Sequence, residues 1–121
     1  ESARGSSLVS QLQTIRSQLE LYQVQHNGDY PTLAQLQAGW GVMISKTDSD
    51  GTINAAGDFG PYLQEAPSNA LTEVAGSRTS VAADNSACWE YTEATGQLRA
   101  VVAAAKAAEL GLAATDFVAA P

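Results

Sequence analysis

Apolar residues recur at helical spacing near the start of the chain, where no glycine or proline interrupts residues 6–27. They follow one another at steps of four, three, four and three, and so form one apolar stripe, composed of Leu8, Leu12, Ile15, Leu19 and Tyr22. Isolated helices of this length are marginal in water, so the apolar stripe needs a surface that covers it. We predict a helix over residues 1–27 whose apolar stripe lies against a small sheet. A helix of an ordinary bundle has the same period, and the period alone does not distinguish the two.

Turn-forming residues mark the end of this predicted helix. The Asn-Gly pair at 27–28 is typical of a left-handed C-cap, and Tyr30 before Pro31 is restricted to extended backbone. Residues 32–35 (Thr-Leu-Ala-Gln) match a capping box and predict a short second helix, which ends near Gly39. We expect loop from residue 40 to residue 65.

Short alternating stretches in the second half of the chain predict strands. Residues 87–92 and 97–103 flank a Glu-Ala-Thr-Gly turn and are typical of a β-hairpin. Residues 73–83 are polar and only weakly strand-like. The alanine-rich stretch at 103–112 is compatible with a terminal helix, and we expect a loose tail over 115–121. The predicted fold is a single α+β domain with four parts: a helix (1–27), a loop region (28–72), an antiparallel sheet (73–103) and a tail (104–121).

The charge of the chain is concentrated in its middle. The net charge is −7 over 121 residues, and both ends are balanced. Residues 29–93 contain only Lys46 and Arg78 as bases, against nine acids: Asp29, Asp48, Asp50, Asp58, Glu65, Glu73, Asp84, Glu90 and Glu93. An acidic surface repels phosphate backbones, so we expect no nucleic-acid partner. A solvated surface that keeps the protein soluble is the simplest meaning of these acids.

Four single residues are candidates for chemistry or for burial in the core. His26 lies at the end of the first helix, where a cation favours the helix dipole, so we predict a capping role rather than catalysis. Cys88 is the only cysteine and is predicted to be a small buried hydrophobe; a nucleophilic pair with His26 is the alternative. We expect Trp89 in the core against the apolar stripe and Trp40 as a buried anchor of its loop, although an exposed Trp40 would mark a partner contact. No cofactor motif is present, and we predict no enzymatic activity.

Calcium is the remaining chemical candidate. Oxygen ligands are dense within eleven residues of the predicted loop, at Asp48, Asp50, Asn54 and Asp58. Lys46 and Gly57 occupy the first and last ligand positions of an EF-hand-like frame, where ligands would be needed. A plain acidic turn is therefore the alternative to a calcium site.

Three segments carry a resemblance to a known family. Residues 15–36 (IRSQLELYQVQHNGDYPTLAQL) resemble the first-helix exit of type IV pilin-like proteins, above all the major pseudopilins of type II secretion systems. Residues 59–71 (FGPYLQEAPSNAL), which include Pro61 and Tyr62, are similar to a Gly-Pro-Tyr-Leu stretch of the family that continues into Pro-x-Asn-Pro. Residues 89–98 (WEYTEATGQL) resemble its hairpin. Each motif is weak by itself, but the three occur in the family's order.

The chain departs from the family in three places. Ala70 follows Asn69 where the family usually has proline, which is expected to loosen that turn. The acidic calcium-binding loop near the C-terminus of many major pseudopilins has no clear match here. One cysteine cannot form the C-terminal disulfide of many type IV pilins, which favours pseudopilins over adhesive pili.

The resemblance implies a structural role without catalysis. A membrane-spanning segment would precede residue 1, a prepilin peptidase would trim and methylate its start, and an ATPase would drive self-assembly with other pseudopilins into a helical filament. The implied location is the periplasm, with the subunit anchored in the bacterial inner membrane beside inner-membrane components of the secretion system. The polar helix face, including an expected local pair of Arg16 with Glu20, would face neighbouring subunits. The alternative is an extracytoplasmic binding module, tuned by calcium, that is not part of a filament.

Overall fold

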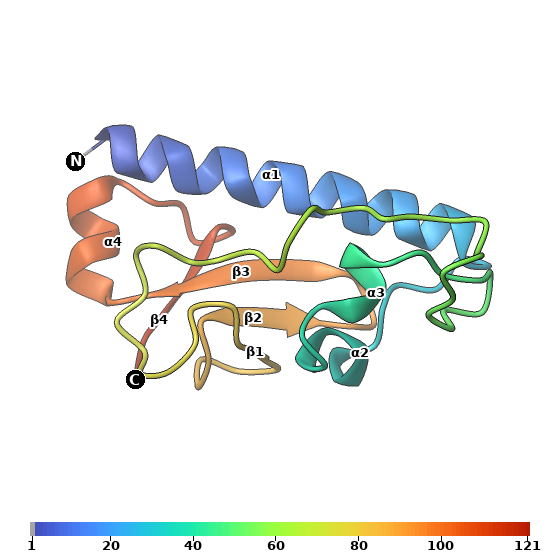
Figure 1. The fold of residues 1–121 in the computed structure, drawn as a ribbon. Coiled ribbons are helices and arrows are strands. Elements are labelled where there is room, and N and C mark those ends of the chain that lie inside the picture. Colours follow the sequence, from blue (N-terminus) through green and yellow to red (C-terminus); the bar gives the residue numbers. More distant parts are fainter. Residues whose placement is uncertain (1) are drawn as a thin grey trace.

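A long helix that lies along a small sheet dominates the computed structural model, which describes residues 2–121 (Figure 1). Helix α1 (Ser2–Gln25) passes over a four-stranded sheet and contacts its strand β3 (Gln97–Val102). All five residues of the apolar stripe are buried, with at most 3% of any of them exposed. The predicted α+β class and the predicted packing of the helix on a sheet are confirmed. No helix among residues 2–121 has the length and apolar character needed to span a membrane.

The beginning of α1 also packs against a second helix, α4 (Ala104–Leu110). Gly5 makes this approach possible, because a Cβ atom there would lie 2.9 Å from the carbonyl oxygen of Leu110. The predicted terminal helix in the alanine-rich stretch is therefore confirmed, and it lies beside the first turns of α1 (Figure 1).

The centre of the sheet is the predicted hairpin. Strand β2 (Trp89–Thr92) pairs antiparallel with β3, and Trp89 lies opposite Ala100. The turn between them closes with the Gly96 amide donating to the Thr92 carbonyl at 2.8 Å, and Gly96 has a φ of 70°. Trp89 is fully buried, as predicted, and its indole nitrogen donates to the carbonyl of Pro67.

The two outer strands correct the predicted sheet. Strands β1 (Val81–Ala82) and β4 (Phe117–Ala119) both pair parallel with their neighbours, so the sheet is mixed rather than antiparallel. Residues 115–121 are not a loose tail, since Val118 pairs with Val101 of β3. Parallel strands need a crossover, and α4 provides it between β3 and β4. Of residues 73–83 only Val81–Ala82 form a strand, in keeping with the weak pattern of that stretch.

The loop region contains two short helices. Helix α2 (Leu33–Gln37) begins with the predicted capping box, in which the Gln35 amide donates to the Thr32 hydroxyl at 3.1 Å. Helix α3 (Gly41–Ile44) was predicted as loop, because a single helical turn has no detectable period. Trp40 precedes it and is 1% exposed, with its indole nitrogen donating to the Thr79 carbonyl, so the predicted buried anchor is confirmed.

The turn at Asn69 is firmly held and not loosened. Asn69 is fully buried, and its carboxamide donates to the carbonyls of Cys88 at 2.8 Å and Val101 at 3.1 Å. Its side-chain oxygen accepts from the Leu71 amide at 3.0 Å. These three hydrogen bonds replace the rigidity that a following proline would have supplied.

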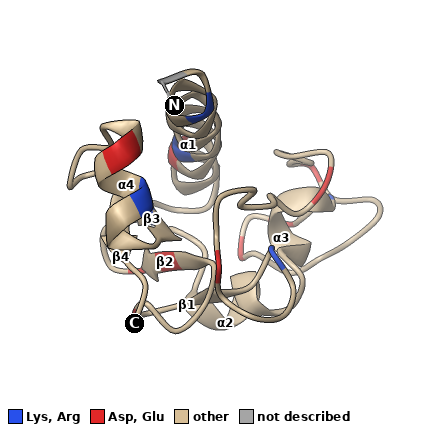
Figure 2. Cartoon of the chain, turned by 90° about the vertical axis from the view of Figure 1, so that its left-hand side faces the viewer, with Lys and Arg blue, Asp and Glu red and all other residues tan. Residues whose placement is uncertain are grey.

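The predicted pair of Arg16 with Glu20 is wrong. Arg16 forms an ion pair with Asp116 at 2.9 Å, and its guanidinium also donates twice to the Leu98 carbonyl. Glu20 instead accepts a hydrogen bond from the Tyr30 hydroxyl. Arg16 therefore ties α1 to the sheet and is not free on the polar face. Figure 2 shows charged residues on both α1 and α4, the two helices at the balanced ends of the chain.

Candidate functional site

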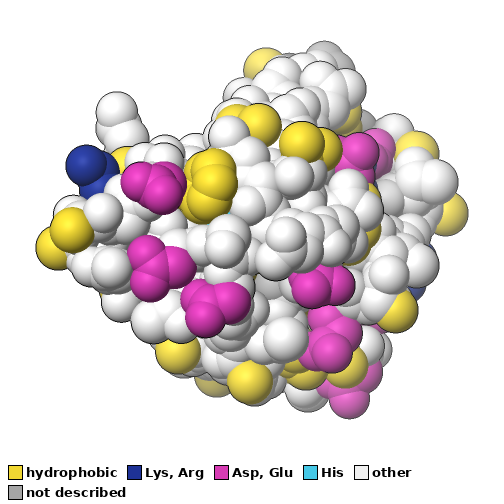
Figure 3. All heavy atoms as spheres, turned by 90° about the vertical axis from the view of Figure 1, so that its right-hand side faces the viewer, with side chains coloured by type: hydrophobic (Ala, Val, Ile, Leu, Met, Phe, Trp, Pro, Cys, Tyr) yellow, Lys and Arg dark blue, Asp and Glu magenta, His cyan; other side chains and the backbone are white. Residues whose placement is uncertain are grey.

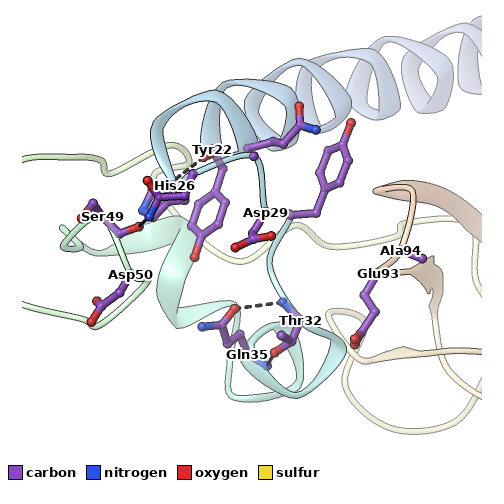
Figure 4. Close-up of a pocket in the computed structure, with 13 residues that line it drawn as sticks. Tyr22, His26, Asp29, Thr32, Gln35, Ser49, Asp50, Glu93 and Ala94 are labelled. Carbon is purple, nitrogen blue, oxygen red and sulfur yellow. Dashed lines mark hydrogen bonds between the residues drawn. The ribbon is translucent and has the colours of Figure 1, made fainter.

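An acidic pocket lies at the C-terminal end of α1 (Figure 4). Its volume is about 520 Å³, and its walls come from the end of α1, the start of α2, the loop at 49–50 and the β2–β3 turn. Three carboxylates line it, those of Asp29, Asp50 and Glu93, and no Lys or Arg belongs to the lining. Figure 3 shows acidic side chains gathered on the face of the molecule at this end of α1. We call this cavity the acidic pocket.

Tyr22 connects the core to the acidic pocket. It is the last member of the apolar stripe and is 2% exposed, and its ring stacks on that of His26 with centroids 3.6 Å apart. Its hydroxyl points into the acidic pocket (Figure 4). No buried side-chain oxygen or nitrogen among the described residues lacks a hydrogen-bond partner, so this hydroxyl is in reach of solvent. Burial raises the pKa of Tyr22 to about 12. The neighbouring Tyr62, Asp29 and Asp50 add to this rise in the pKa, because negative charges disfavour a phenolate.

His26 caps the helix from a buried position. Its Nδ1 donates to the Tyr22 carbonyl at 2.7 Å, which confirms the predicted capping of a helix-terminal carbonyl. Its Nε2 lies 2.7 Å from the hydroxyl of Thr47, a fully buried residue of the loop region. Both ring nitrogens are thus occupied. The alternative pair with Cys88 is not formed, since the buried Cys88 thiol donates to the Ser77 carbonyl.

The predicted calcium ligands lie in one loop but make hydrogen bonds to that loop. The Asn54 amide nitrogen donates to both carboxylate oxygens of Asp48, at 3.1 and 3.4 Å, and the Asn54 oxygen accepts from a backbone amide. Asp50 accepts from the Thr52 amide at 2.9 Å, and this hydrogen bond lowers the pKa of Asp50. Asp58 is exposed further along the loop. Within residues 2–121 no three His, Cys, Asp or Glu side chains are grouped as metal ligands, and calcium binding stays a prediction.

Two carboxylates of the acidic pocket, those of Glu93 and Asp29, were not predicted as site residues from the sequence. Glu93 accepts from the Leu33 amide at 2.7 Å and so caps α2 from the β2–β3 turn. Asp29 follows the turn at residues 26–28 that comes after α1, and its side chain is exposed. The two are far apart along the chain, and their segments meet through the packing of Tyr30 against Gly96 and the hydrogen bond from the Leu33 amide to Glu93. No local signal in the sequence predicts that meeting.

The aromatic residues quoted for the family resemblance join the loops to the end of α1. The Tyr62 hydroxyl, one residue after Pro61, donates to the side-chain oxygen of Gln25 at 2.6 Å. The buried Tyr91 hydroxyl donates to the Pro31 carbonyl at 2.8 Å. These hydrogen bonds hold the walls of the acidic pocket in place.

The chain matches no family model, and comparisons with curated proteins and with solved structures find no match either.

Proposed function

We propose that this chain is the periplasmic domain of a structural subunit of a type II secretion pseudopilus or a related type IV pilus-like filament. In this proposal a membrane segment precedes α1, anchors the subunit in the inner membrane and later packs in the filament core. The observation that carries the proposal is α1, a long helix of 24 residues that the rest of the chain covers on one face only.

The uncovered face of α1 has a composition that suits helix packing between subunits. We call it the exposed face; its members lie at helical spacing and are Ser10, Gln13, Ser17, Leu21 and Val24. The first three are small or uncharged, so another helix can approach closely there. Leu21 and Val24 are 42% and 75% exposed, which is unusual for large apolar side chains. A mixed surface of this kind is typical of contacts between proteins.

The three segments of the family resemblance also lie together in the structure. Residues 15–36 contain the end of α1 and most of helix α2, and residues 59–71 contribute Tyr62 to that end of α1. Residues 89–98 contain β2, the β2–β3 turn and the start of β3, and their Tyr91 donates to Pro31. The three motifs therefore lie in one continuous region around the C-terminal end of α1. This arrangement is expected for the pilin-like fold that we propose.

The acidic pocket favours a second candidate function, an extracytoplasmic binding module that is not part of a filament. Such a module would need the carboxylates of the acidic pocket, but it would not need the exposed face of α1. The two candidates can therefore be separated by testing that face.

Disulfide cross-linking in cells that express the full-length protein tests the filament proposal. We expect the double variant Ser10→Cys with Ser17→Cys, combined with Cys88→Ala, to form cross-linked oligomers that disappear when the assembly ATPase is deleted. The matched control is Ala83→Cys in the same background, because Ala83 is exposed and directly follows β1, an edge strand of the sheet, whereas α1 contacts β3. Equal cross-linking at Ala83, or none at the exposed face, would overturn the proposal.

A further inference from the structure

We infer that Ile53 of one subunit docks into an apolar groove at the opposite end of a second copy of this chain, so that subunits join head to tail. This contact rests on the filament proposal and adds to it, because it uses surfaces other than the exposed face of α1. Three features carry it: a groove with fixed walls, an exposed isoleucine, and the charges that surround each of them.

The groove runs along the first half of α1, beside the turn at Asn69. We call it the apolar groove; the residues that define it are Arg4, Ser7, Leu8, Gln11, Ala70 and Leu71. Leu8 and Leu71 contribute almost fully buried side chains to its lining, and Arg4 is the charged residue beside them. Its volume is about 290 Å³, which is at the lower limit of small-ligand sites and is enough for one aliphatic side chain.

Hydrogen bonds hold both walls of the apolar groove before anything binds. The Gln11 side chain donates to the Ser68 carbonyl at 2.9 Å and so ties α1 to the segment before the turn. The Arg78 guanidinium donates to the Ala70 carbonyl at 2.8 Å, and the buried carboxamide of Asn69 fixes the turn itself. A groove that is ordered in advance loses little freedom when a side chain enters it, which favours binding.

Ile53 is the exposed apolar residue at the other end of the molecule. Of the large apolar side chains exposed among residues 2–121, Leu21 and Val24 belong to the exposed face of α1, and Ile53 is the third, at 54% exposed. Its backbone bridges to Thr47, which is in turn hydrogen-bonded to His26 beyond the end of α1. The loop that carries Ile53 is therefore held at the C-terminal end of α1 (Figure 1). Covering an aliphatic side chain of this size is favourable.

The charges around Ile53 and around the apolar groove are complementary. The loop of Ile53 contains Lys46 and three acids, which are Asp48, Asp50 and Asp58. Figure 3 shows acidic side chains gathered on this end of the molecule. At the other end the charged residue of the apolar groove is Arg4, and both ion pairs among residues 2–121 use other arginines. Opposite charges at two surfaces favour their encounter and fix their orientation.

The positions of these two surfaces identify the partner as a second copy. Because the apolar groove and Ile53 lie at opposite ends of α1, each subunit can insert its own Ile53 into one neighbour and receive that of another. A contact between two different surfaces of the same chain repeats from copy to copy and gives an open filament unless the rotation closes a ring. This is the kind of contact that the proposed filament needs.

Disulfide cross-linking in cells that express the full-length protein tests the inference. In the Cys88→Ala background we expect Ser7→Cys with Ile53→Cys to form ladders of cross-linked subunits. Ala70→Cys with Ile53→Cys is a second pair across the same groove, and all these positions are exposed, so the fold should be retained. The matched control is Ser7→Cys with Ala83→Cys, which should cross-link about tenfold less, because a disulfide needs Cα atoms within about 7 Å.

The charge beside the apolar groove is tested by adding Arg4→Glu to the chain with Ser7→Cys and Ile53→Cys. We expect about fivefold less cross-linking, because like charges would then face each other. Lys106→Glu is the matched control, since Lys106 lies on α4 and does not line the apolar groove. Equal losses from the two charge reversals would mean general charge attraction and would overturn the inference.

The outcomes separate this contact from the filament proposal. Cross-links through the exposed face without cross-links at either Ile53 pair would overturn the inference and leave the filament proposal in place. No cross-links at any of these pairs would overturn both. Ile53 cross-links that persist when the assembly ATPase is deleted would show association outside a filament and would overturn the inference, as would a disulfide from Ser7→Cys to a different protein in place of a second copy.

Discussion

The sheet side of α1 and its C-terminal end are held in different ways. Along the sheet, the apolar stripe gives continuous burial with few directional contacts. At the end of the helix the contacts are hydrogen bonds of single polar groups: His26 with Thr47, and Tyr62 with Gln25. Apolar burial tolerates small shifts, whereas hydrogen bonds require defined positions. The first region therefore supplies stability, and the second fixes the geometry around the acidic pocket.

The largest effect is expected in the apolar stripe. Leu12 is fully buried, so Leu12→Ala should lower the free energy of unfolding by about 2–5 kcal/mol, through lost burial and the cavity left behind. Gln13→Ala, on the exposed face, is the control and should change it by less than about 0.5 kcal/mol. Urea denaturation followed by circular dichroism measures both. Similar losses in the two variants would contradict burial as the source of stability.

A smaller effect is expected at the end of the helix. Thr47→Val keeps the shape of a fully buried side chain but removes the partner of His26 Nε2, so it should cost about 1–3 kcal/mol. Thr92→Val is the control, because Thr92 is exposed. The same urea titration applies. A Thr47→Val protein as stable as the parent would show that the hydrogen bond does not hold the loop.

The ion pair between α1 and the residue before β4 should contribute less. Arg16→Met retains much of the aliphatic side chain but loses the pairing with Asp116, and we expect a loss of about 1 kcal/mol. Arg4→Met on the exposed start of α1 is the control. Hydrogen exchange of the Val118 amide should accelerate in Arg16→Met alone. Unchanged exchange there would mean that Arg16 does not fasten β4.

The last effect is a change in the shape of the pH profile of stability, and it is absent below pH 10. The pKa of Tyr22 is about 12 in the folded chain and about 10 when unfolded, so its contribution is complete below pH 10 and is lost as pH rises towards 12. Burial also raises the pKa of Tyr91, which acts in the same direction. The free energy of unfolding of Tyr22→Phe should therefore fall less steeply between pH 10 and pH 12 than that of the parent. Parallel profiles for the parent and Tyr22→Phe would contradict the burial of this phenol.

Long-range pairing limited what the sequence could predict. The helix, its apolar stripe, the capping box at Thr32 and the hairpin were predictable because each depends on residues close together in the chain. Strand β4 was not, since a strand of three residues has no period and forms only where α4 returns the chain to β3. Arg16 likewise has a plausible local partner in Glu20, but its actual partner is Asp116.

The acidic pocket was predictable only in part, for the same reason. Asp50 was singled out from the density of oxygen ligands in its loop, and Tyr22 from the period of the helix. Their meeting with Asp29 and Glu93 depends on how the loop region folds back on α1. The sequence indicated the acidic character of this region, whereas the cavity emerges from tertiary packing.

The central claim is that α1 has one face for its own sheet and another for neighbouring subunits. The most direct measurement is the amount of filament formed by a full-length Ser17→Trp variant, compared with Ala83→Trp, since both substitutions add the same bulk at exposed positions. We predict that Ser17→Trp abolishes filaments while the isolated domain unfolds at the same urea concentration as the parent, and that Ala83→Trp assembles normally. Normal filaments from Ser17→Trp would contradict the claim.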